Sequence, residues 1–418
     1  MTDRWTLKKF GDCADLIRDT IAPEAAQNVP YIGLEHIIEG GLTLSGHGYS
    51  DEVISAKNRF KKGDILFGKL RPYFRKVIIA PFDGVCSTDI WVVRAKAGTD
   101  QKFLFYWMAS QEFVEEATRA SEGTKMPRAK WEFVVQIEKE IPLLPTQRII
   151  AHILGSLDDK NEVNRKMNET LEAIAKAIFQ SWFMDFDPVQ AKAGGRQPEE
   201  MDAVTAALFP SEFEEIGGRE VPKGWMISSL PEIFEINPQR SLEKDQIAPY
   251  LDMQNVPTRG HRPIDWVDRA FSYGTKFVNG DTLLARITPC LENGKTIFVD
   301  FLEEAQVGWG STEYIVLRPK PPLPPEFGYL LARNEEFRAH AILNMSGTSG
   351  RQRVPSKCFD SHQIVVPTKA ISEKFGENIK SLMERIKKND EQSRALAALR
   401  ETLLPKLMCG EIQAKNWT

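Results

Sequence analysis

The sequence predicts an α+β fold in which two tandem α/β domains are each followed by a long helix. Three observations predict this fold: motifs that repeat between the two halves, β-strand patterns early in each half, and heptad spacing late in each half. A chain of 418 residues is too long for one ordinary hydrophobic core and suits two or three domains. The whole pattern is that of a pseudo-two-fold duplication.

The repeat is carried by short motifs that occur in the same order in both halves. GDILFGKLRP starts at Gly63 and returns as GDTLLARITP at Gly280. The offset between matched residues drifts only from 217 to 225, which a chance resemblance would not maintain. The other matches are Ser87-Thr88-Asp89 with Ser311-Thr312-Glu313, Arg94 with Arg318, Gly123-Thr124 with Gly347-Thr348, Ile141-Pro142 with Val366-Pro367, and Trp5 with Trp225.

Composition excludes several classes of protein. Apolar residues make up 42% and charged residues 27%, which is typical of a globular chain. No apolar run approaches the roughly 18 residues of a membrane span, and the first residues lack a signal-peptide pattern, so we expect a cytoplasmic protein. The five cysteines and six histidines show no disulfide or metal-ligand spacing, so no metal site is expected. The net charge of −4 excludes a uniformly basic surface but not local basic patches.

The first part of each half has the pattern of a mixed α/β domain. Apolar runs at 77–79 and 90–93 predict strands, and Gly, Pro and Asp residues mark the turns between them. Aromatic and aliphatic residues at helical spacing predict one amphipathic helix near 101–119 and a counterpart near 326–343. We interpret the aromatic stripe of the first helix as core packing.

The second part of each half predicts a long helix. Apolar residues recur at three- and four-residue steps after Pro145 and again after Pro367. Residues seven apart form a seam with an asparagine at the same step of each copy, and a buried asparagine can fix the register of a coiled coil. The alternative is two helices that each pack only on their own globular part. The seam residues are Leu157, Asn164, Leu171 and Ile178 in the first copy, and Leu382, Asn389, Leu396 and Leu403 in the second.

These patterns divide the chain into six expected segments. They are a first α/β domain (1–145), a first helix (146–187), a linker (188–224), a second α/β domain (225–367), a second helix (368–412) and a tail (413–418). The linker is rich in glycine, proline and acidic residues, so we expect it to be solvated. Its acidic residues also explain how a chain with negative net charge can carry basic surfaces elsewhere.

Basic and hydroxyl residues cluster at equivalent places in the two halves. Lys and Arg neutralise phosphates, and Arg, Gln and Thr can hydrogen-bond to base edges in the major groove, so these segments favour DNA binding. A solvated charged face is the other interpretation of such runs. The candidate DNA-binding residues are Lys69, Arg71, Tyr73, Arg75, Lys76, Thr124, Lys125, Arg128 and Lys130 in the first half, and Arg286, Thr288, Thr348, Arg351, Gln352 and Arg353 in the second.

Three segments resemble fragments of enzyme motifs, but each lacks the rest of its motif. Gly294-Lys295-Thr296 has no glycine five residues earlier, so Asn293-Gly294 is better interpreted as a hairpin turn. Asn237-Pro238-Gln239-Arg240 lacks the aromatic residue of a methyltransferase motif and no cofactor loop precedes it. Asp158-Asp159-Lys160 lies in the first predicted helix without a partner acid. We predict no catalytic residue.

Two further segments give the chain a family resemblance. Residues 141–150, IPLLPTQRII, lead into Leu157-Asp158, and residues 403–412 read LLPKLMCGEI. With the GDIL and GTKMPR segments and the two long helices, the chain resembles the specificity subunit of a type I restriction–modification enzyme along nearly its whole length. One departure is that the second half shows Val365-Val366-Pro367-Thr368 in place of the Leu-Pro-x-Gln-Arg lead-in.

The resemblance implies a non-catalytic DNA reader. Each α/β domain would be a target-recognition domain for one half of a split DNA target, and the two helices would pack antiparallel as a spacer. Two modification subunits would methylate adenine with S-adenosylmethionine, and restriction subunits would add an ATP- and Mg-dependent nuclease, so this chain itself would bind no cofactor.

Helix length and loop sequence predict the form of the target. A seam of roughly 34 residues is about 50 Å long, which would hold two readers about 15 base pairs apart. The loops of the two halves differ, so the target should be bipartite and asymmetric. Two alternatives stay open at this point: a stand-alone DNA-bridging protein without a methyltransferase partner, and a fused enzyme with an unrecognised active site.

Overall fold

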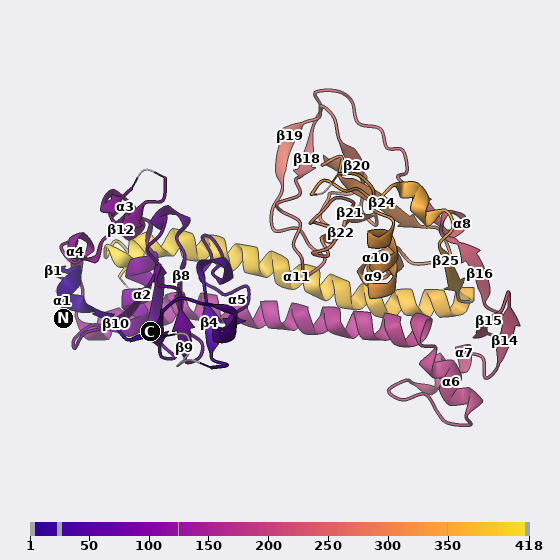
Figure 1. Ribbon diagram of the computed structural model, residues 1–418, viewed down its shortest axis with the longest axis horizontal. Coiled ribbons are helices and arrows are strands. Elements are labelled where there is room, and N and C mark those ends of the chain that lie inside the picture. Colours follow the sequence, from indigo (N-terminus) through magenta and orange to yellow (C-terminus); the bar gives the residue numbers. More distant parts are fainter. Residues whose placement is uncertain (1–4, 23–26, 124, 349, 414–418) are drawn as a thin grey trace. The chain divides into compact units, whose positions relative to one another are not determined.

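A computed structural model describes residues 5–22, 27–123, 125–348 and 350–413 of the chain. The chain divides into two compact units. Unit 1 contains Met1–Glu162 and Ser393–Thr418, and unit 2 contains Val163–Gln392. Both divisions fall inside long helices, α5 (Leu144–Phe179) and α11 (Lys369–Met408), which are drawn in magenta and yellow in Figure 1. Each unit therefore contains one segment of each helix.

Unit 1 is built on two β-sheets, in which most neighbouring strands are antiparallel. The first sheet has the order β2 (Ala14–Ile17), β10 (Ile90–Ala95), β7 (Ile65–Gly68) and β8 (Val77–Ile79). The second has the order β3 (Thr20–Ile21), β6 (Lys57–Phe60), β9 (Gly84–Cys86), β4 (Pro30–Ile32) and β5 (Gly48–Tyr49), and within it β4 and β9 are parallel. The strands predicted at 77–79 and 90–93 are confirmed.

Unit 1 also contains two short strand pairs and several short helices. Strands β1 (Thr6–Lys9) and β13 (Glu138–Ile141) pair, as do β11 (Ser121–Glu122) and β12 (Arg128–Ala129). The short helices are α1 (Phe10–Cys13), α4 (Trp131–Val134), η2 (Leu34–His36), η3 (Ser50–Glu52) and η4 (Pro72–Phe74).

Unit 2 repeats this topology in its main sheets, except that its second sheet has four strands and no counterpart of β3. Its first sheet has the order β17 (Phe234–Ile236), β24 (Tyr314–Pro319), β21 (Thr282–Ala285) and β22 (Thr296–Phe298). Its second has the order β19 (Val267–Ala270), β18 (Ile247–Leu251), β23 (Gly308–Gly310) and β20 (Thr275–Phe277), with β18 and β23 parallel. Strands β16 (Met226–Ser229) and β25 (Gln363–Val366) pair as β1 and β13 do, and α8 (Leu230–Ile233) and η6 (Ser356–Phe359) complete the domain. The duplication seen in the sequence is thus a duplication of fold.

The repeated Gly-Asp motif has a structural reason in both units. Gly63 and Gly280 adopt left-handed φ values of 91° and 88°, which glycine adopts without strain. The buried carboxylate of Asp64 accepts hydrogen bonds from the backbone N–H of Lys61 at 2.7 Å and from Arg94. Asp281 likewise accepts from the Val278 N–H at 2.8 Å and from Arg318 at 2.7 Å. The motif therefore fixes the turn that begins β7 and β21.

The amphipathic helices expected at 101–119 and 326–343 are each two helices, so the prediction of one continuous helix was wrong. They are α2 (Gln101–Ala109) with α3 (Gln111–Arg119), and α9 (Pro325–Arg333) with α10 (Glu335–Leu343). The break falls at Ser110 in unit 1 and at Asn334 in unit 2, where each residue is extended and its side chain caps the second helix. Ser and Asn are good N-caps because their side chains satisfy the free N–H groups of a helix start.

The long helices pack against one another in antiparallel fashion, as the seam predicts. In unit 2, Asn164 of α5 donates to the carbonyl of Asn389 of α11 at 3.3 Å, and the rings of Phe179 and Phe375 lie 6.2 Å apart further along. In unit 1, Asp158 of α5 accepts from Arg400 of α11 at 2.8 Å. Positions later in α5 thus meet positions earlier in α11 in each unit.

The asparagines of the seam are its most deeply buried polar residues. Asn164 is fully buried and also donates to Gln392 at 3.0 Å, while Asn389 donates to Asn168 at 2.8 Å. Each asparagine therefore binds a group on the opposite helix, which specifies the register. Leu403 is buried as well, whereas Leu157, Leu171, Ile178, Leu382 and Leu396 are half-buried.

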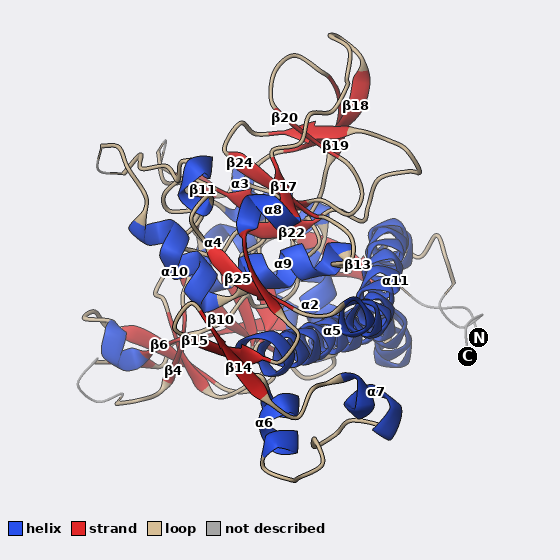
Figure 2. Cartoon of the chain, turned by 90° about the vertical axis from the view of Figure 1, so that its right-hand side faces the viewer, coloured by secondary structure: helices blue, strands red, loops and turns tan. Residues whose placement is uncertain are grey.

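The helices also complete the hydrophobic core of each α/β domain. In unit 1, Leu404 and Leu407 of α11 share a cluster with Leu154 of α5 and with the aromatic residues of α2. In unit 2, the ring of Phe327 of α9 lies edge-to-face with those of Phe179 of α5 and Phe375 of α11, with ring centroids 5.1 and 6.3 Å away. Figure 2 shows α9 between the sheet and the paired helices.

The segment expected to be a solvated linker is folded in part. It contains α6 (Asp187–Ala193), α7 (Ala203–Leu208) and the hairpin β14 (Phe213–Ile216) with β15 (Arg219–Pro222), after a π-helical turn at Gln180–Met184. Its acidic residues are exposed, but Val189, Phe209 and Val221 are buried. These few apolar residues anchor the segment on unit 2, and the expectation of a fully solvated linker was wrong.

The seam leads to a first prediction. Replacing Asn164 by alanine removes two hydrogen bonds in a buried site, so we expect Asn164→Ala to lower the free energy of unfolding by about 1–3 kcal/mol. The measurement is urea denaturation followed by circular dichroism. Val163→Ala is the matched control, because Val163 is half exposed on the same turn, and it should change stability by less than about 0.5 kcal/mol. Equal effects of the two substitutions would contradict the assigned role.

Candidate nucleic-acid interface

In unit 1, two segments carrying predicted DNA-binding residues meet each other and Asp89 at the end of strand β7. The Ala129 N–H donates to the Lys69 carbonyl at 2.9 Å, and the Arg71 N–H donates to the Pro127 carbonyl at 2.8 Å. The Lys69 N–H in turn donates to the Asp89 carbonyl at 2.9 Å. We call this set, residues 69–71, 89 and 127–129, the first paired edge.

The same set of backbone hydrogen bonds recurs in unit 2 at the end of strand β21. The Val354 N–H donates to the Arg286 carbonyl at 2.8 Å, and the Thr288 N–H donates to the Gln352 carbonyl at 3.1 Å. The Arg286 N–H donates to the Glu313 carbonyl at 2.9 Å. Residues 286–288, 313 and 352–354 form the second paired edge.

The hydrogen bonds settle which residues of the two loops are equivalent. Leu70 bridges to Arg128 in the first edge, and Ile287 bridges to Arg353 in the second. Arg128 therefore corresponds to Arg353, whereas an alignment of the loops by their Gly-Thr motifs would place Arg128 opposite Gln352. The second loop is one residue longer, and a sequence comparison had no signal for where that residue is added.

An arginine–carboxylate pair lies at the same place on both edges. The Nε and Nη2 of Arg128 donate to the carboxylate of Asp89 at 2.8 and 3.1 Å. The Nε and Nη2 of Arg353 donate to Glu313 at 2.9 and 2.7 Å. Hydrogen bonding to the carboxylate raises the pKa of each guanidinium, so both arginines stay charged.

Four of the other predicted cations are held by groups of the protein itself. Arg75 is largely buried, and its guanidinium donates to the Ala109 carbonyl at 2.7 Å and to both carboxylate oxygens of Glu401 at 2.9 and 3.0 Å. These contacts give it a structural role, tying η4 to α11. Lys76 donates to the Leu34 carbonyl at 2.6 Å and Lys130 pairs with Glu122, while Arg71 donates to the Lys125 carbonyl at 3.3 Å and lies over the Phe74 ring.

The remaining predicted residues differ in exposure. Lys69, Arg286, Thr288 and Gln352 are half-buried in the edges, where the Thr288 hydroxyl accepts from the Gln352 N–H at 3.1 Å. Tyr73, Lys125, Thr348 and Arg351 are exposed to solvent. Thr124 lies outside the described residues. None of these residues is tested as a DNA contact by the geometry alone, and their binding role stays a prediction.

A polar cavity of about 430 Å³ adjoins the second edge and was missed by the sequence interpretation. Arg286 and Thr312 line it, together with Gln239, Arg240 and Tyr273. The segment Asn237-Pro238-Gln239-Arg240 had been set aside as a chance motif. Asn237 has a structural role, because its side chain accepts from the Val316 N–H at 2.9 Å, and Arg240 pairs with the buried Asp281.

Asp158, from the segment Asp158-Asp159-Lys160, also has a structural role. Asp158 accepts from the Tyr106 hydroxyl at 2.6 Å and from Arg400 at 2.8 Å. Arg400 reaches Glu401 at 2.8 Å, so a chain of polar contacts joins α2 to both long helices within unit 1. Among the described residues no cluster of His, Cys, Asp or Glu could hold a metal ion.

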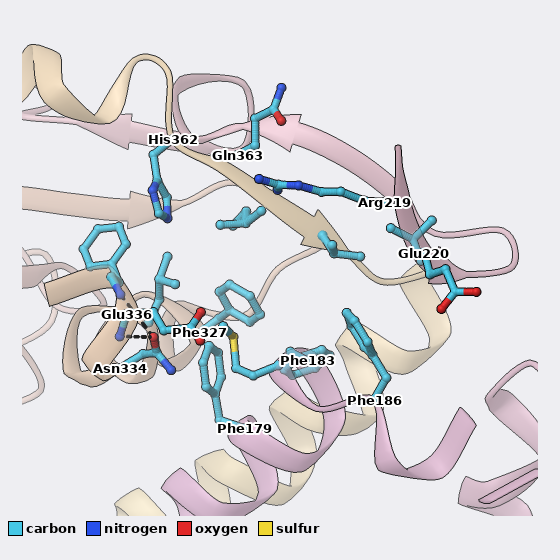
Figure 3. Close-up of a pocket in the computed structure, with 16 residues that line it drawn as sticks. Phe179, Phe183, Phe186, Arg219, Glu220, Phe327, Asn334, Glu336, His362 and Gln363 are labelled. Carbon is cyan, nitrogen blue, oxygen red and sulfur yellow. Dashed lines mark hydrogen bonds between the residues drawn. The ribbon is translucent and has the colours of Figure 1, made fainter. Parts of the chain in front are cut away.

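A second cavity, of about 490 Å³, lies in unit 2 (Figure 3). Phe179, Phe183 and Phe186 form its lower wall, His362 and Gln363 at the start of β25 lie above, and the β14–β15 hairpin supplies one side. None of the predicted DNA-binding residues lines it. Its aromatic wall is continuous with the core of unit 2, so we assign the cavity to the packing of the hairpin over the π-helical turn.

Comparison with known proteins agrees with this architecture. Residues 3–173 match the family model described as the type I restriction modification DNA specificity domain. The chain is 26% identical over 459 aligned residues to the specificity subunit of the type I restriction enzyme HindI of Haemophilus influenzae, and the alignment covers 98% of this chain and 99% of that protein. The chain is thus similar along nearly its whole length to type I restriction–modification specificity subunits. The resemblance expected from the sequence is confirmed.

Two further comparisons extend across most of the chain. The specificity subunit of the type I restriction enzyme MjaIX of Methanocaldococcus jannaschii is 24% identical over 366 residues, covering 85% of this chain and 79% of that protein. The crystal structure of a type I specificity subunit from M. genitalium covers 97% of this chain with a TM-score of 0.58 at 16% identity, which shows a shared fold. No helix in the described part of the chain is long and apolar enough to cross a membrane.

The Arg75 contacts lead to a second prediction. Because Arg75 and Glu401 share two hydrogen bonds in a partly buried site, we expect a double-mutant cycle of Arg75→Ala and Glu401→Gln to give a coupling energy of about 1–3 kcal/mol. Thermal and urea unfolding of the four proteins measure it. Lys125→Ala, which removes an exposed cation near the first paired edge, should leave the free energy of unfolding within about 0.5 kcal/mol of that of the unsubstituted chain. If the two substitutions change the free energy of unfolding additively, the ion pair between Arg75 and Glu401 does not stabilise the fold.

The cavity in unit 2 leads to a third prediction. Burial, with the neighbouring His340 and Arg219, lowers the pKa of His362 from 6.5 to about 4. The unfolded chain therefore binds a proton near pH 6.5 that the folded chain binds only near pH 4, so protonation destabilises the fold as the pH falls through this range.

Because His362 is partly exposed, solvent screening limits the size of the effect. We expect His362→Phe to reduce the loss of folding stability between pH 7 and pH 4.5 by about 1–2 kcal/mol. Thermal unfolding at the two pH values measures it. The exposed His152→Gln should lose as much stability on acidification as the unsubstituted chain. If His362→Phe behaves in the same way, the shifted pKa of His362 does not govern the acid sensitivity.

Proposed function

We propose that this chain is a non-catalytic, sequence-specific DNA-binding subunit that reads a bipartite, asymmetric target. The observation that carries the proposal is the paired edge, which recurs with the same backbone hydrogen bonds in both units and brings the predicted cations together. Loops that end strands and carry Lys, Arg, Thr and Gln can contact both phosphates and base edges. Two such edges in one chain suit a target of two separate half-sites.

The differences between the edges support an asymmetric target. The first edge ends in an exposed loop with Lys125 and Met126, whereas the second has Thr348, Gly350 and Arg351 in the corresponding loop. Side chains of different length and hydrogen-bonding capacity select different base pairs. We therefore propose that the two half-sites differ in sequence.

The paired helices support a fixed gap between the half-sites. Helix α5 contains 36 residues and is thus about 54 Å long, the length of about 16 base pairs of duplex DNA. Because the buried asparagines specify one register of α5 on α11, the length of the pair is set by the sequence. We propose that this length determines the number of unread base pairs.

The partners are proposed on the strength of the family. We propose that two modification subunits bind this chain and methylate adenine in the target with S-adenosylmethionine, and that restriction subunits add ATP- and Mg-dependent cleavage. S-adenosylmethionine, ATP and Mg would then belong to these partners and not to this chain. The target-recognition domains proposed at 1–145 and 225–367 would carry the reading function.

The test of this function is to map methylated adenines in DNA from cells that express the chain with its co-purifying subunits. We expect one motif made of two different half-sites with an unread gap, and a footprint that covers both. The purified chain alone should transfer no methyl group from S-adenosylmethionine to DNA. Methyl transfer by the chain alone would contradict the non-catalytic assignment, and DNA binding without any co-purifying methyltransferase would favour a stand-alone DNA-bridging protein.

A fourth prediction tests whether the length of the helix pair sets the number of unread base pairs. Inserting one heptad at equivalent steps of both α5 and α11 keeps the seam in phase, so the pair lengthens by about 10 Å and the gap should grow by about three base pairs. Mapping the methylated motif measures the change. Inserting the heptad in α5 alone is the control, and it should destabilise the chain because the asparagines lose their partners. An unchanged gap in the double insertion would contradict this role of the helix pair.

A further inference from the structure

We propose that Arg128 and Arg353 each read a guanine in the major groove, and that Asp89 and Glu313 position their guanidinium groups for it. This inference rests on the proposed function and specifies what each paired edge recognises. It begins with the equivalence of the two arginines, which occupy the same bridge position beside Leu70 and Ile287. Both side chains are 46% exposed, so both reach solvent.

The carboxylates bind the same edge of each guanidinium group. A guanidinium has one pair of parallel donors at Nε and Nη2 and a second pair at Nη1 and Nη2. Asp89 and Glu313 both accept from the first pair. Within the described residues no acceptor is hydrogen-bonded to Nη1 of either arginine, so the second pair faces outward with two parallel N–H groups.

That outward pair of donors matches one base edge better than the others. Guanine presents two acceptors in the major groove, O6 and N7, which a pair of parallel donors can bind together. Adenine presents N7 beside an N6 donor, and that donor would face an N–H of the arginine. Cytosine and thymine present only one polar group each in the groove. Two donors held in parallel therefore select guanine.

The charge of the pair favours a base over a phosphate. Phosphate binding relies on net positive charge, and the neighbouring carboxylate neutralises the guanidinium at close range. The hydrogen-bonding capacity of Nη1 and Nη2 is not removed by that neutralisation. The carboxylate would also repel a phosphate placed beside it. A neutral, oriented donor pair thus loses attraction to the backbone but keeps its complementarity to a guanine.

The duplication supplies an independent argument for positioning. The acid is an aspartate in the first edge and a glutamate, longer by one methylene, in the second, yet each accepts from Nε and Nη2 of its arginine. An exposed ion pair of this kind adds little stability. An arginine loses side-chain entropy on binding, and fixing its plane beforehand reduces that loss. The retained geometry therefore serves orientation.

The experiment uses the full chain with its co-purifying subunits and a pool of randomised duplexes, from which the bound target is selected and sequenced. We expect a G·C pair in each half-site, and we expect Arg128→Ala to reduce the preference for guanine at one position by about 5- to 150-fold. Arg353→Ala should do the same in the other half-site. Arg165→Ala, which removes an arginine paired with a glutamate on α5, should leave both preferences unchanged.

Modified bases identify the atoms that are read. Replacing the selected guanine by 7-deazaguanine removes the N7 acceptor and should weaken binding by the unsubstituted chain, with a smaller effect on Arg128→Ala. Inosine keeps O6 and N7 and should bind as guanine does. Asp89→Asn should lower the guanine preference while leaving the midpoint of thermal unfolding unchanged. The exchange of Asp89→Arg with Arg128→Asp keeps an ion pair and should abolish the preference in a folded chain.

Other outcomes separate this inference from the proposed function. If Arg128→Ala weakens binding equally for every sequence and flattens the salt dependence, the arginine binds phosphate and the inference is wrong, while selection of a bipartite target would still support the proposed function. A loss caused by inosine rather than by 7-deazaguanine would place the contact in the minor groove and also overturn it. If the original chain selects no sequence at all, the proposed function itself fails.

Discussion

The fold depends on an exchange of helices between the two halves of the sequence. The core of unit 1 includes Leu403, Leu404 and Leu407, which follow it in the chain by more than two hundred residues, and the core of unit 2 includes Ala175 and Phe179 from the first half. Burying a side chain of this size contributes about 1.5–3 kcal/mol. An α/β domain without the helix of the other half would therefore expose an apolar face, so the helices are part of the core of each domain.

Electrostatics at the paired edges differs from that of a general DNA-binding surface. Many cations predicted to bind phosphates are bound to carbonyl or carboxylate groups of the protein, among them Arg75, Lys76 and Arg128. The edges thus offer oriented donors with only a moderate excess of positive charge. Such a surface would bind arbitrary DNA weakly, because that binding depends on counterion release, and would rely on base contacts for discrimination. The net charge of −4 is consistent with weak binding to DNA of arbitrary sequence.

Most of the architecture could be predicted from the sequence, because the duplication leaves short motifs that recur in the same order in both halves. The seam asparagines, Asn164 and Asn389, could be identified from heptad spacing alone, and the structure brings both to the interface of the helices. The breaks at Ser110 and Asn334 were missed, although Ser and Asn are good N-caps, because the apolar pattern continues through them. Hydrophobic periodicity reports which face is buried, and it is insensitive to a local change of backbone direction.

The candidate site was less accessible from the sequence than the fold. A cation in a basic run looks the same whether it faces solvent or pairs with a distant acid, so the tie between Arg75 and Glu401, 326 residues away, had no local signal. The equivalence of Arg128 and Arg353 likewise required the backbone bridges, since one added residue shifts the alignment of the loops.

The interleaved cores also have a consequence for biosynthesis. Unit 2 is one continuous stretch, Val163–Gln392, whereas unit 1 needs the segment that begins at Ser393. Translation therefore delivers every residue of the second domain before the first can close its core. Domains usually fold in the order in which they leave the ribosome. Here we expect the reverse order. The N-terminal domain cannot bury its apolar face until the C-terminal part of α11 has been synthesised.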